Sequence, residues 1–296
     1  MRIEARGVGK RFGGVTALTD VWFDVPSRSR VALVGPNGSG KSTLNRILMG
    51  LLAYEGEVRL DGRCPFRERV AVARRMAYVP QIAPQLAAPV SEVVGAIARV
   101  RGVGREDVAQ VARALGLEPA SVAERPFRSL SGGTKQKLLI ALALVSGASL
   151  LILDEPTGSL DARARERFFE LFDSLAPDAS LVLCSHRLDE IRPLVDHVLL
   201  LEEGRLAYQG PARAFLERSA LATLEARVEG EEAEAWLAAR GFRRARAGVW
   251  RRTLHPTEKM KQVSELVREL GPRLLDLNAR ELDSLELGPP ERKGRG

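Results

Sequence analysis

Residues 35–43, GPNGSGKST, constrain the fold more than any other stretch of this chain. They follow the apolar run at residues 31–34 and lead into residues 44–48, whose pattern is helical. A strand, a glycine-rich loop and a helix in this order form the context that a phosphate-binding P-loop requires. An ordinary glycine-rich turn is the plainer alternative, but the complete G-x4-G-K-S spacing argues against it. We therefore expect an α/β fold that binds a nucleoside triphosphate.

Each residue type in this loop has a physical task. Gly35, Gly38 and Gly40 allow backbone angles that side chains forbid, so that successive N–H groups can point at one phosphate. Lys41, at the positive end of the following helix, can reach the β- and γ-phosphates, and the Ser42 hydroxyl is placed to bind Mg²⁺. The complete set that we expect at the nucleotide is Gly35, Pro36, Asn37, Gly38, Ser39, Gly40, Lys41, Ser42 and Thr43.

Length and composition bound the rest of the chain. With 296 residues, 45% hydrophobic and 28% charged, it can form an α/β domain and a smaller second domain. It contains neither the roughly 20 apolar residues of a membrane span nor a signal peptide in residues 1–10. Cys64 and Cys184 lack metal-ligand spacing, so we expect reduced thiols in a cytoplasmic protein. The net charge of +7 suits nucleic acid or an anionic membrane, but an arginine-rich genome explains it as well.

Two candidate nucleotide contacts flank the early strands. Residues 2–5 and 21–25 are expected to be strands, with a Gly-Gly turn between them and Phe12 just before that turn. Phe12 is either a partly buried structural aromatic or an exposed ring that stacks on a nucleobase. Gln81 follows the apolar strand at residues 76–80, at the edge where open α/β sheets bind ligands, although a solvated loop residue is the alternative.

A helical insertion precedes a second anion site. Residues 91–116 show apolar residues at three- and four-residue spacings, which predicts helices inserted between sheet strands. After them, Ser131 is a natural N-cap for the apolar helix at residues 135–145. Its first N–H groups, beside Gly132 and Gly133, are free to bind an anion.

Two carboxylates follow the aliphatic run at residues 150–153, which fits a parallel strand buried on both faces. Asp154 and Glu155 would be costly there unless they meet a cation or a proton. Beside a P-loop, we expect Asp154 to bind Mg²⁺ and Glu155 to act on the attacking water. Without one, two acids would more often cap a loop. His186 ends the next apolar strand and is expected to reach the γ-phosphate, although a lone histidine is usually an ordinary structural residue.

Residues 222–280 have a different texture. Their expected order is a strand, a helix, two strands, a helix and a strand, which is the ferredoxin-like α+β pattern. We expect them to form a second domain after a first domain of residues 1–211, whose helical part covers about residues 82–130. Residues 289–296 are expected to be a disordered tail.

Taken together, these motifs resemble the ATP-binding cassette ATPases, the nucleotide-binding subunits of ABC transporters. The resemblance covers about residues 1–211, and the motifs stand in the family's order. They are the P-loop, Gln81 as the Q-loop glutamine, the signature LSGGTKQ at 130–136, the acid pair, the D-loop Ser159-Leu160-Asp161 and the switch histidine His186. Thr134 departs from the usual signature glutamine, and Ala162 from the usual D-loop proline.

The resemblance implies a site shared between two subunits. The signature helix of one cassette would cap ATP on the P-loop of another, so turnover would need a homodimer or a paralogous partner. The implied cofactors are ATP and Mg²⁺, and the implied catalytic residues are Lys41, Glu155 and His186. Mg²⁺ would be held by Ser42, Gln81 and Asp154, and further nucleotide contacts would come from Phe12, Ser131, Gly132, Gly133 and Asp161.

The resemblance also implies a separate integral membrane permease, docked on the helical insertion, with this chain peripheral on the inner face of the cell membrane. A single cassette with a small C-terminal domain resembles the ATPase subunits of drug, lipid or metal-maturation exporters. The alternative is a soluble ABC ATPase that acts on the ribosome or nucleic acid. It is disfavoured because this chain has neither a second cassette nor a long coiled-coil insertion. A regulatory module without turnover is disfavoured because Glu155 and His186 are both present.

Overall fold

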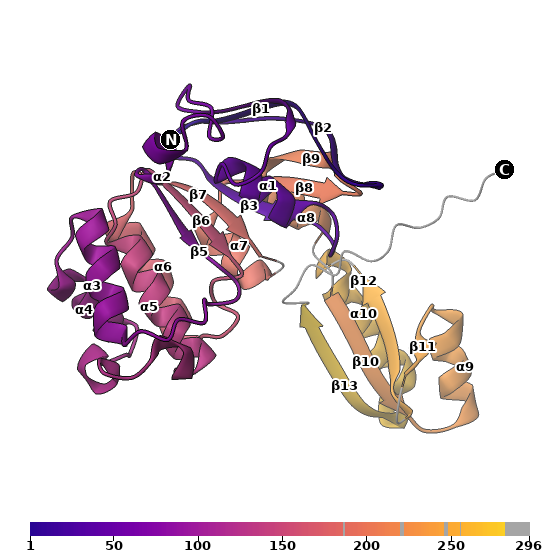
Figure 1. Ribbon diagram of the computed structural model, residues 1–296. Coiled ribbons are helices and arrows are strands. Elements are labelled where there is room, and N and C mark those ends of the chain that lie inside the picture. Colours follow the sequence, from indigo (N-terminus) through magenta and orange to yellow (C-terminus); the bar gives the residue numbers. More distant parts are fainter. Residues whose placement is uncertain (186, 220–221, 246–247, 255, 282–296) are drawn as a thin grey trace. The chain divides into compact units, whose positions relative to one another are not determined.

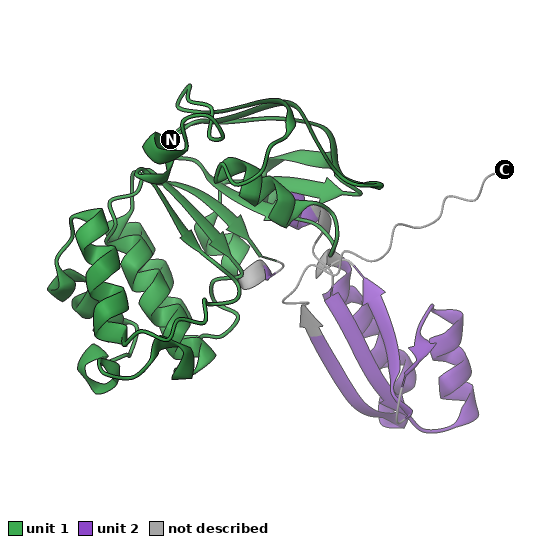
Figure 2. Cartoon of the chain, viewed as in Figure 1, with its two compact units in different colours: residues 1–186, 190–213, 287–296 green, residues 187–189, 214–286 purple. Residues whose placement is uncertain are grey.

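The computed structural model describes residues 1–185, 187–219, 222–245, 248–254 and 256–281 (Figure 1). The chain divides into two compact units, the first formed mainly by residues 1–213 and the second mainly by residues 214–286 (Figure 2). The predicted tail at residues 289–296 lies outside the described residues.

A six-stranded sheet of order β5-β6-β7-β3-β8-β9 forms the centre of the first unit. The strands from β5 to β8 are parallel, and β9 pairs with β8 antiparallel. The aliphatic runs of β3, β6 and β7 are buried on both faces of the sheet, whereas β9 at its edge alternates between exposed and partly buried residues. The bounds are β3 (Arg30–Val34), β5 (Met76–Val79), β6 (Leu150–Asp154), β7 (Ser180–Cys184), β8 (His197–Glu202) and β9 (Arg205–Pro211).

A second, antiparallel sheet of order β2-β1-β4 is formed by β1 (Ile3–Phe12), β2 (Val15–Val25) and β4 (Glu55–Leu60). The β1–β2 hairpin is longer than the sequence predicts, because register shifts after Ala5 carry the pairing on to Phe12 and Val15. Its turn lies at Gly13 and Gly14, as expected. Alternate residues such as Ile3 and Ala5 are buried, so one face of this sheet packs on the core.

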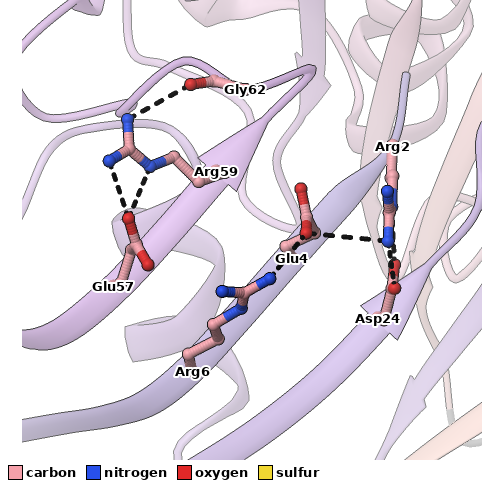
Figure 3. Close-up of polar contacts among 7 residues, drawn as sticks. All are labelled: Arg2, Glu4, Arg6, Asp24, Glu57, Arg59 and Gly62. Atoms are coloured by element: carbon pink, nitrogen blue, oxygen red, sulfur yellow. Dashed lines mark hydrogen bonds and ion pairs between the residues drawn. The ribbon is translucent and has the colours of Figure 1, made fainter.

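Ion pairs lie on the exposed face of this antiparallel sheet (Figure 3): the Arg2–Asp24 pair reaches from the start of β1 to β2, whereas Glu4–Arg6 and Glu57–Arg59 are pairs within β1 and within β4. Arg2 Nη2 lies 2.5 Å from Asp24 Oδ2, and Arg6 Nη2 lies 3.2 Å from Glu4 Oε1. Arg59 donates to Glu57 Oε1 at 2.7 Å. Exposed pairs of this kind are worth about 0–1 kcal/mol each. The buried face therefore contributes more to stability than this network does.

Helices flank the central sheet of the first unit (Figure 1). The ends of the helical insertion are tied together, since Val90 donates its backbone N–H to Arg125 O at 3.0 Å and Phe127 donates to Ala88 O at 2.9 Å. The two ends of the insertion between β5 and α5 are thus held together by backbone hydrogen bonds. The helices are α1 (Lys41–Leu48), α2 (Arg69–Ala73), α3 (Val90–Arg101), α4 (Arg105–Ala114), α5 (Gly132–Leu144), α6 (Ala162–Leu175), α7 (Leu188–Leu194) and α8 (Ala212–Ser219).

Among its described residues, the second unit contains the part of α8 from residue 214 onward, an antiparallel sheet of order β11-β12-β10-β13 and two further helices. Its core contains Leu224, Leu237, Phe242 and Leu266. The elements follow the order expected from the sequence, although β11 is shorter than the run at residues 242–247. They are β10 (Ala222–Val228), α9 (Glu231–Ala239), β11 (Arg243–Arg244), β12 (Trp250–Leu254), α10 (Pro256–Leu270) and β13 (Leu274–Glu281).

Within the described ranges, no helix is both long and apolar enough to cross a membrane. Cys64 is partly buried and Cys184 is buried, and both are free thiols.

Candidate nucleotide site

The P-loop joins β3 to α1, and its backbone needs glycine. Gly35, Gly38 and Gly40 have φ of 149°, 82° and 105°, which residues with a side chain rarely adopt. A Cβ on Gly35 would lie 2.2 Å from the carbonyl oxygen of Leu201, and one on Gly40 would lie 2.6 Å from that of Ala17. The loop is therefore packed directly against β8 and β2, and larger residues do not fit at these two positions.

The β8–β9 hairpin, which is distant in sequence, also packs against the P-loop. Gly204, in the turn between β8 and β9, donates its backbone N–H to Ser39 O at 3.2 Å and accepts from Thr19 N at 2.8 Å. A Cβ on Gly204 would lie 2.8 Å from the carbonyl oxygen of Ala17. The β8–β9 turn is thus bonded to both the P-loop and β2.

Lys41 is half-buried and turned back onto its own loop. Its Nζ donates to the carbonyl oxygens of Gly35 at 2.6 Å and Pro36 at 3.0 Å. Burial lowers the pKa of Lys41, while the nearby carboxylates of Glu155 and Asp154 act in the opposite direction. The P-loop lysine and the acid pair therefore share one electrostatic environment.

Asp154 ends β6 and is partly buried. Burial raises the pKa of its carboxyl group, and the neighbouring Glu155 adds to this rise. Tyr78 donates its Oη to Asp154 Oδ2 at 3.4 Å, and burial together with Asp154 raises the pKa of Tyr78 to about 12. Tyr78 is not among the residues predicted from the sequence, although its phenol in an otherwise apolar strand could have indicated it. A carboxylate in this setting is stabilised by a nearby cation.

Glu155 occupies a backbone conformation that is unusual for its type. Its φ is 48°, in the left-handed region, which costs a residue with a side chain roughly 1–2 kcal/mol. Its backbone N–H donates to Cys184 O at 2.8 Å, which ties the end of β6 to β7. The neighbouring strands thus help to fix the direction in which Glu155 leaves the sheet.

Three other residues predicted to contact the nucleotide are Gln81, Phe12 and His186. The pairing of Val79 with Leu153 brings the ends of β5 and β6 to the same edge, so exposed Gln81 follows one strand as Glu155 follows the other. Phe12 is 45% exposed at the end of β1, with Lys10 Nζ 5.0 Å from its ring centroid. His186 lies outside the described residues.

The signature residues form a second group around the start of α5. Ser131 Oγ accepts from Thr134 N at 3.2 Å and is 2.7 Å from Thr134 Oγ1, so Ser131 is the N-cap and Thr134 reinforces it. Gly132 and Gly133 follow, and a Cβ on Gly133 would lie 2.7 Å from Ser159 O. The tip of the signature helix is therefore packed against the D-loop.

Asp161 is held within the same group. It caps α6 by accepting from Ala164 N at 2.8 Å, and it pairs with Lys137 Nζ at 3.1 Å. The backbone bond from Ala164 and then the charge of Lys137 lower the pKa of Asp161. The D-loop acid thus joins the starts of α5 and α6.

This fold and site define a P-loop nucleoside triphosphatase: a lysine on a glycine loop beside an acid pair at the carboxyl edge of a mainly parallel sheet. A sequence profile of the ABC transporter family matches residues 18–158. The chain is 35% identical over 244 residues to the nickel import ATP-binding protein NikO of Rhodobacter capsulatus, covering 74% of this chain and 92% of that protein. It belongs to the ATP-binding subunits of ABC transporters.

Relatives and solved structures include both directions of transport. The chain is 34% identical over 222 residues to the Nod factor export ATP-binding protein I of a Rhizobium species, covering 73% of this chain and 72% of that protein. A solved bacterial Atm1-family ABC exporter with ATP bound superposes with a TM-score of 0.67 at 26% identity, over 82% of this chain and 42% of that one. ABC ATP-binding subunits hydrolyse ATP to drive transport, and they act with membrane permease components, typically as dimers.

Proposed function

We propose that this chain hydrolyses ATP between two cassettes and thereby drives an exporter through a separate permease. The observation that carries the proposal is the parallel pairing of β3 and β6 with β7, which brings the P-loop with Lys41 and the acid pair Asp154 and Glu155 to the same carboxyl edge of the central sheet. Phosphoryl transfer to water needs positioning and charge neutralisation more than covalent help from the protein. A lysine and two carboxylates around a ring of backbone N–H groups can supply both.

Each residue of the cluster would have its own task. Lys41 would exchange its bonds to Gly35 and Pro36 for bonds to the β- and γ-phosphates. Glu155, whose direction is fixed by its backbone, would orient or deprotonate the attacking water. His186 is proposed at the γ-phosphate on its sequence position alone. Phe12 is exposed and would stack on adenine.

The residues at this edge fit Mg²⁺. The hydroxyl of Ser42 and the carboxylate of Asp154 are oxygen ligands of the kind that Mg²⁺ prefers, and Gln81 would join them. A bound cation would also offset the burial that raises the pKa of Asp154. Among the described residues, no group of three or more His, Cys, Asp or Glu could hold a metal alone, so the phosphates would complete the set. Mg²⁺ bound there would neutralise charge on the β- and γ-phosphates.

The signature group would form the other half of the site. Ser131 caps α5, and the N–H groups of Gly132 and Gly133 lie at the positive end of that helix. A γ-phosphate held by the P-loop of a second subunit, a homodimer partner or a paralogous cassette, would bind there. Asp161 of the D-loop would transmit closure, since it joins α5 to α6.

The permease would dock on the helical insertion. Ile82 and Val100 are 80% and 85% exposed, and Leu86 is 40% exposed, so apolar side chains face outward along this part of the chain. Arg101 donates to Ala73 O at 3.3 Å, which fixes the end of α3 against α2, where Val70 is 68% exposed. A short amphipathic helix of a membrane protein is the occupant that such a surface fits. The chain would then be peripheral on the inner membrane face.

The second unit would be a ferredoxin-like domain beginning near residue 222. The support is its βαββαβ order and its sheet order β11-β12-β10-β13. The exporter assignment rests on a cassette that is followed by a small second unit and on the similarity to the Nod factor export ATP-binding protein I. The rival, an ATPase acting on the ribosome or nucleic acid, finds no support among the transport subunits that the chain resembles.

Glu155→Gln tests the hydrolytic role. The variant should bind ATP like the parent, lose turnover at least about a hundredfold and accumulate as an ATP-bound dimer in light scattering. Glu57→Gln is a control, because Glu57 is a glutamate on the exposed face of the antiparallel sheet, outside the acid pair and away from the P-loop. Hydrolysis by Glu155→Gln at the parental rate would overturn the assignment.

Two further measurements test the partner and the direction. The tagged chain should co-purify with an integral membrane protein, whereas RNA or DNA retained at high salt would favour the rival function. With that membrane protein in inside-out vesicles, ATP should drive substrate into the lumen. Substrate movement out of the lumen would make the complex an importer.

A further inference from the structure

A buried side-chain hydrogen bond joins the loop after Glu155 to helix α7. Thr157 Oγ1 donates to Glu190 Oε1, and both residues have 0% exposure. Thr157 follows Glu155 by two residues, and Glu190 lies four residues after His186 in the sequence. The segment after β6 and the helix after β7 are therefore linked through their side chains as well as through the sheet.

Stability alone does not account for such a pair. A buried carboxylate is costly, and it persists only where hydrogen bonds compensate it. Apolar side chains of similar volume are often as stabilising as a buried charged or polar pair. A polar pair at this point, next to the acid that acts on water, indicates a geometric task.

Glu155 needs such support on its C-terminal side. Its left-handed φ of 48° is a conformation that residues with side chains keep only where their surroundings fix it. Before it stands β6, and its own N–H is bonded to Cys184 O. After it, Gly158 N donates to Glu155 O at 3.4 Å and Leu160 N donates to Thr157 O at 2.9 Å. The Thr157–Glu190 bond anchors this double turn to a helix.

We propose that Thr157 and Glu190 are positioning residues for ATP hydrolysis: their bond holds the backbone at Glu155 so that its carboxylate is aimed at the attacking water. This inference rests on the proposed role of Glu155. It predicts an effect on kcat rather than on ATP binding, because the P-loop is built by β3 and α1 and not by these two segments.

Thr157→Val and Thr157→Ser provide the first test. Valine keeps the shape and removes the donor, whereas serine keeps the donor. We expect Thr157→Val to lower kcat about 10- to 100-fold, as misplacement of a reacting group does, with the KM for ATP changed less than about twofold. Thr157→Ser should stay within about threefold of the parent. Thr223→Val is the matched control, since Thr223 is 3% exposed in the second unit.

The double variant Thr157→Val/Glu190→Met separates positioning from folding. It leaves neither the hydroxyl nor the carboxylate of the pair in place, and its urea midpoint, compared with that of Thr157→Val, measures how stability changes when both groups are removed. Its kcat should nevertheless stay low, because the hydrogen bond between residues 157 and 190 that positions Glu155 is absent.

Three results would overturn the inference: parental kcat in Thr157→Val, equal losses in the serine and valine variants, or recovery of kcat together with stability in the double variant. Parental turnover in Glu155→Gln would instead defeat the proposed function. An inactive Glu155→Gln beside a fully active Thr157→Val would defeat the positioning role alone.

Discussion

Lys41 Nζ lies 2.6 Å from the carbonyl oxygen of Gly35, so the P-loop lysine is hydrogen-bonded to the loop that it belongs to. A second bond, 3.0 Å long, joins it to Pro36 O. These bonds satisfy a half-buried ammonium group that would otherwise be costly. ATP must replace them, so the affinity for nucleotide reflects the difference between two bonded states of the lysine.

Lys41→Ala should lose nucleotide binding. A charge-assisted hydrogen bond to phosphate is worth about 1.5–3 kcal/mol, so the loss of two such bonds should weaken binding by roughly a hundredfold or more. Titration with a fluorescent ATP analogue measures it, with Lys261→Ala in the second unit as the control. Unchanged affinity would remove Lys41 from the site.

Asp154→Asn should stabilise the nucleotide-free protein at neutral pH. Burial and then Glu155 raise the folded-state pKa of Asp154, so the folded chain holds this proton more tightly than the unfolded chain. Between the ordinary and the raised pKa of Asp154, the free energy of unfolding therefore falls as pH rises. The asparagine side chain of the variant does not titrate, so the variant does not lose this stability.

Melting temperatures without nucleotide check the sign. The advantage of Asp154→Asn over the parent should be present at pH 7, shrink as pH falls through the raised pKa of Asp154, and be lost below about 3.9, the ordinary aspartate pKa. An advantage that grows on acidification would contradict the sign. The same variant should lose turnover by about a hundredfold, since it removes the proposed metal ligand.

Phe12→Ala should weaken ATP binding by about 1 kcal/mol, the typical worth of an aromatic stack. Val15→Ala is the control, because Val15 is 69% exposed and pairs with Phe12 across the hairpin turn. Calorimetric titration measures both variants, and Phe12→Tyr should restore affinity. Equal affinities in all of them would leave Phe12 as a structural aromatic.

Gly133→Ala should destabilise the first unit while Gly132→Ala does not. A Cβ on Gly133 would lie 2.7 Å from Ser159 O, whereas one on Gly132 would lie 3.6 Å from Ser159 Oγ, an ordinary contact. We expect a loss of about 1–3 kcal/mol for the first variant and no loss, or a slight gain from helix propensity, for the second. Urea unfolding compares the stability of the two variants. Equal midpoints would contradict the prediction, because they would mean that the D-loop shifts to accommodate the new Cβ at little cost.

The sequence predicted the parts of the site that depend on local pattern. Local spacing in the sequence was enough to predict the roles of Gly35, Lys41 and Ser131, because the P-loop and the helix N-cap are each built from a few consecutive residues. Helices α2, α7 and α8 were not predicted, since such short helices show little apolar periodicity. The placement of His186 stays a prediction.

Contacts between segments that are distant in sequence could not be predicted, for a different reason. Tyr78 reaches Asp154 only because β5 pairs with β6, and Thr157 reaches Glu190 only because β6 pairs with β7. No residue type or spacing encodes which strands are neighbours. The strand order supplied by the fold therefore decided which side chains support the acid pair.

The hydrogen bond from Gly204 to Ser39 has a consequence for biosynthesis. During translation the glycine loop emerges early, while the turn that closes over it emerges only when most of the first unit has been made. A nascent chain can therefore form β3 and α1 without a finished pocket, and ATP can select only chains whose late hairpin has already docked.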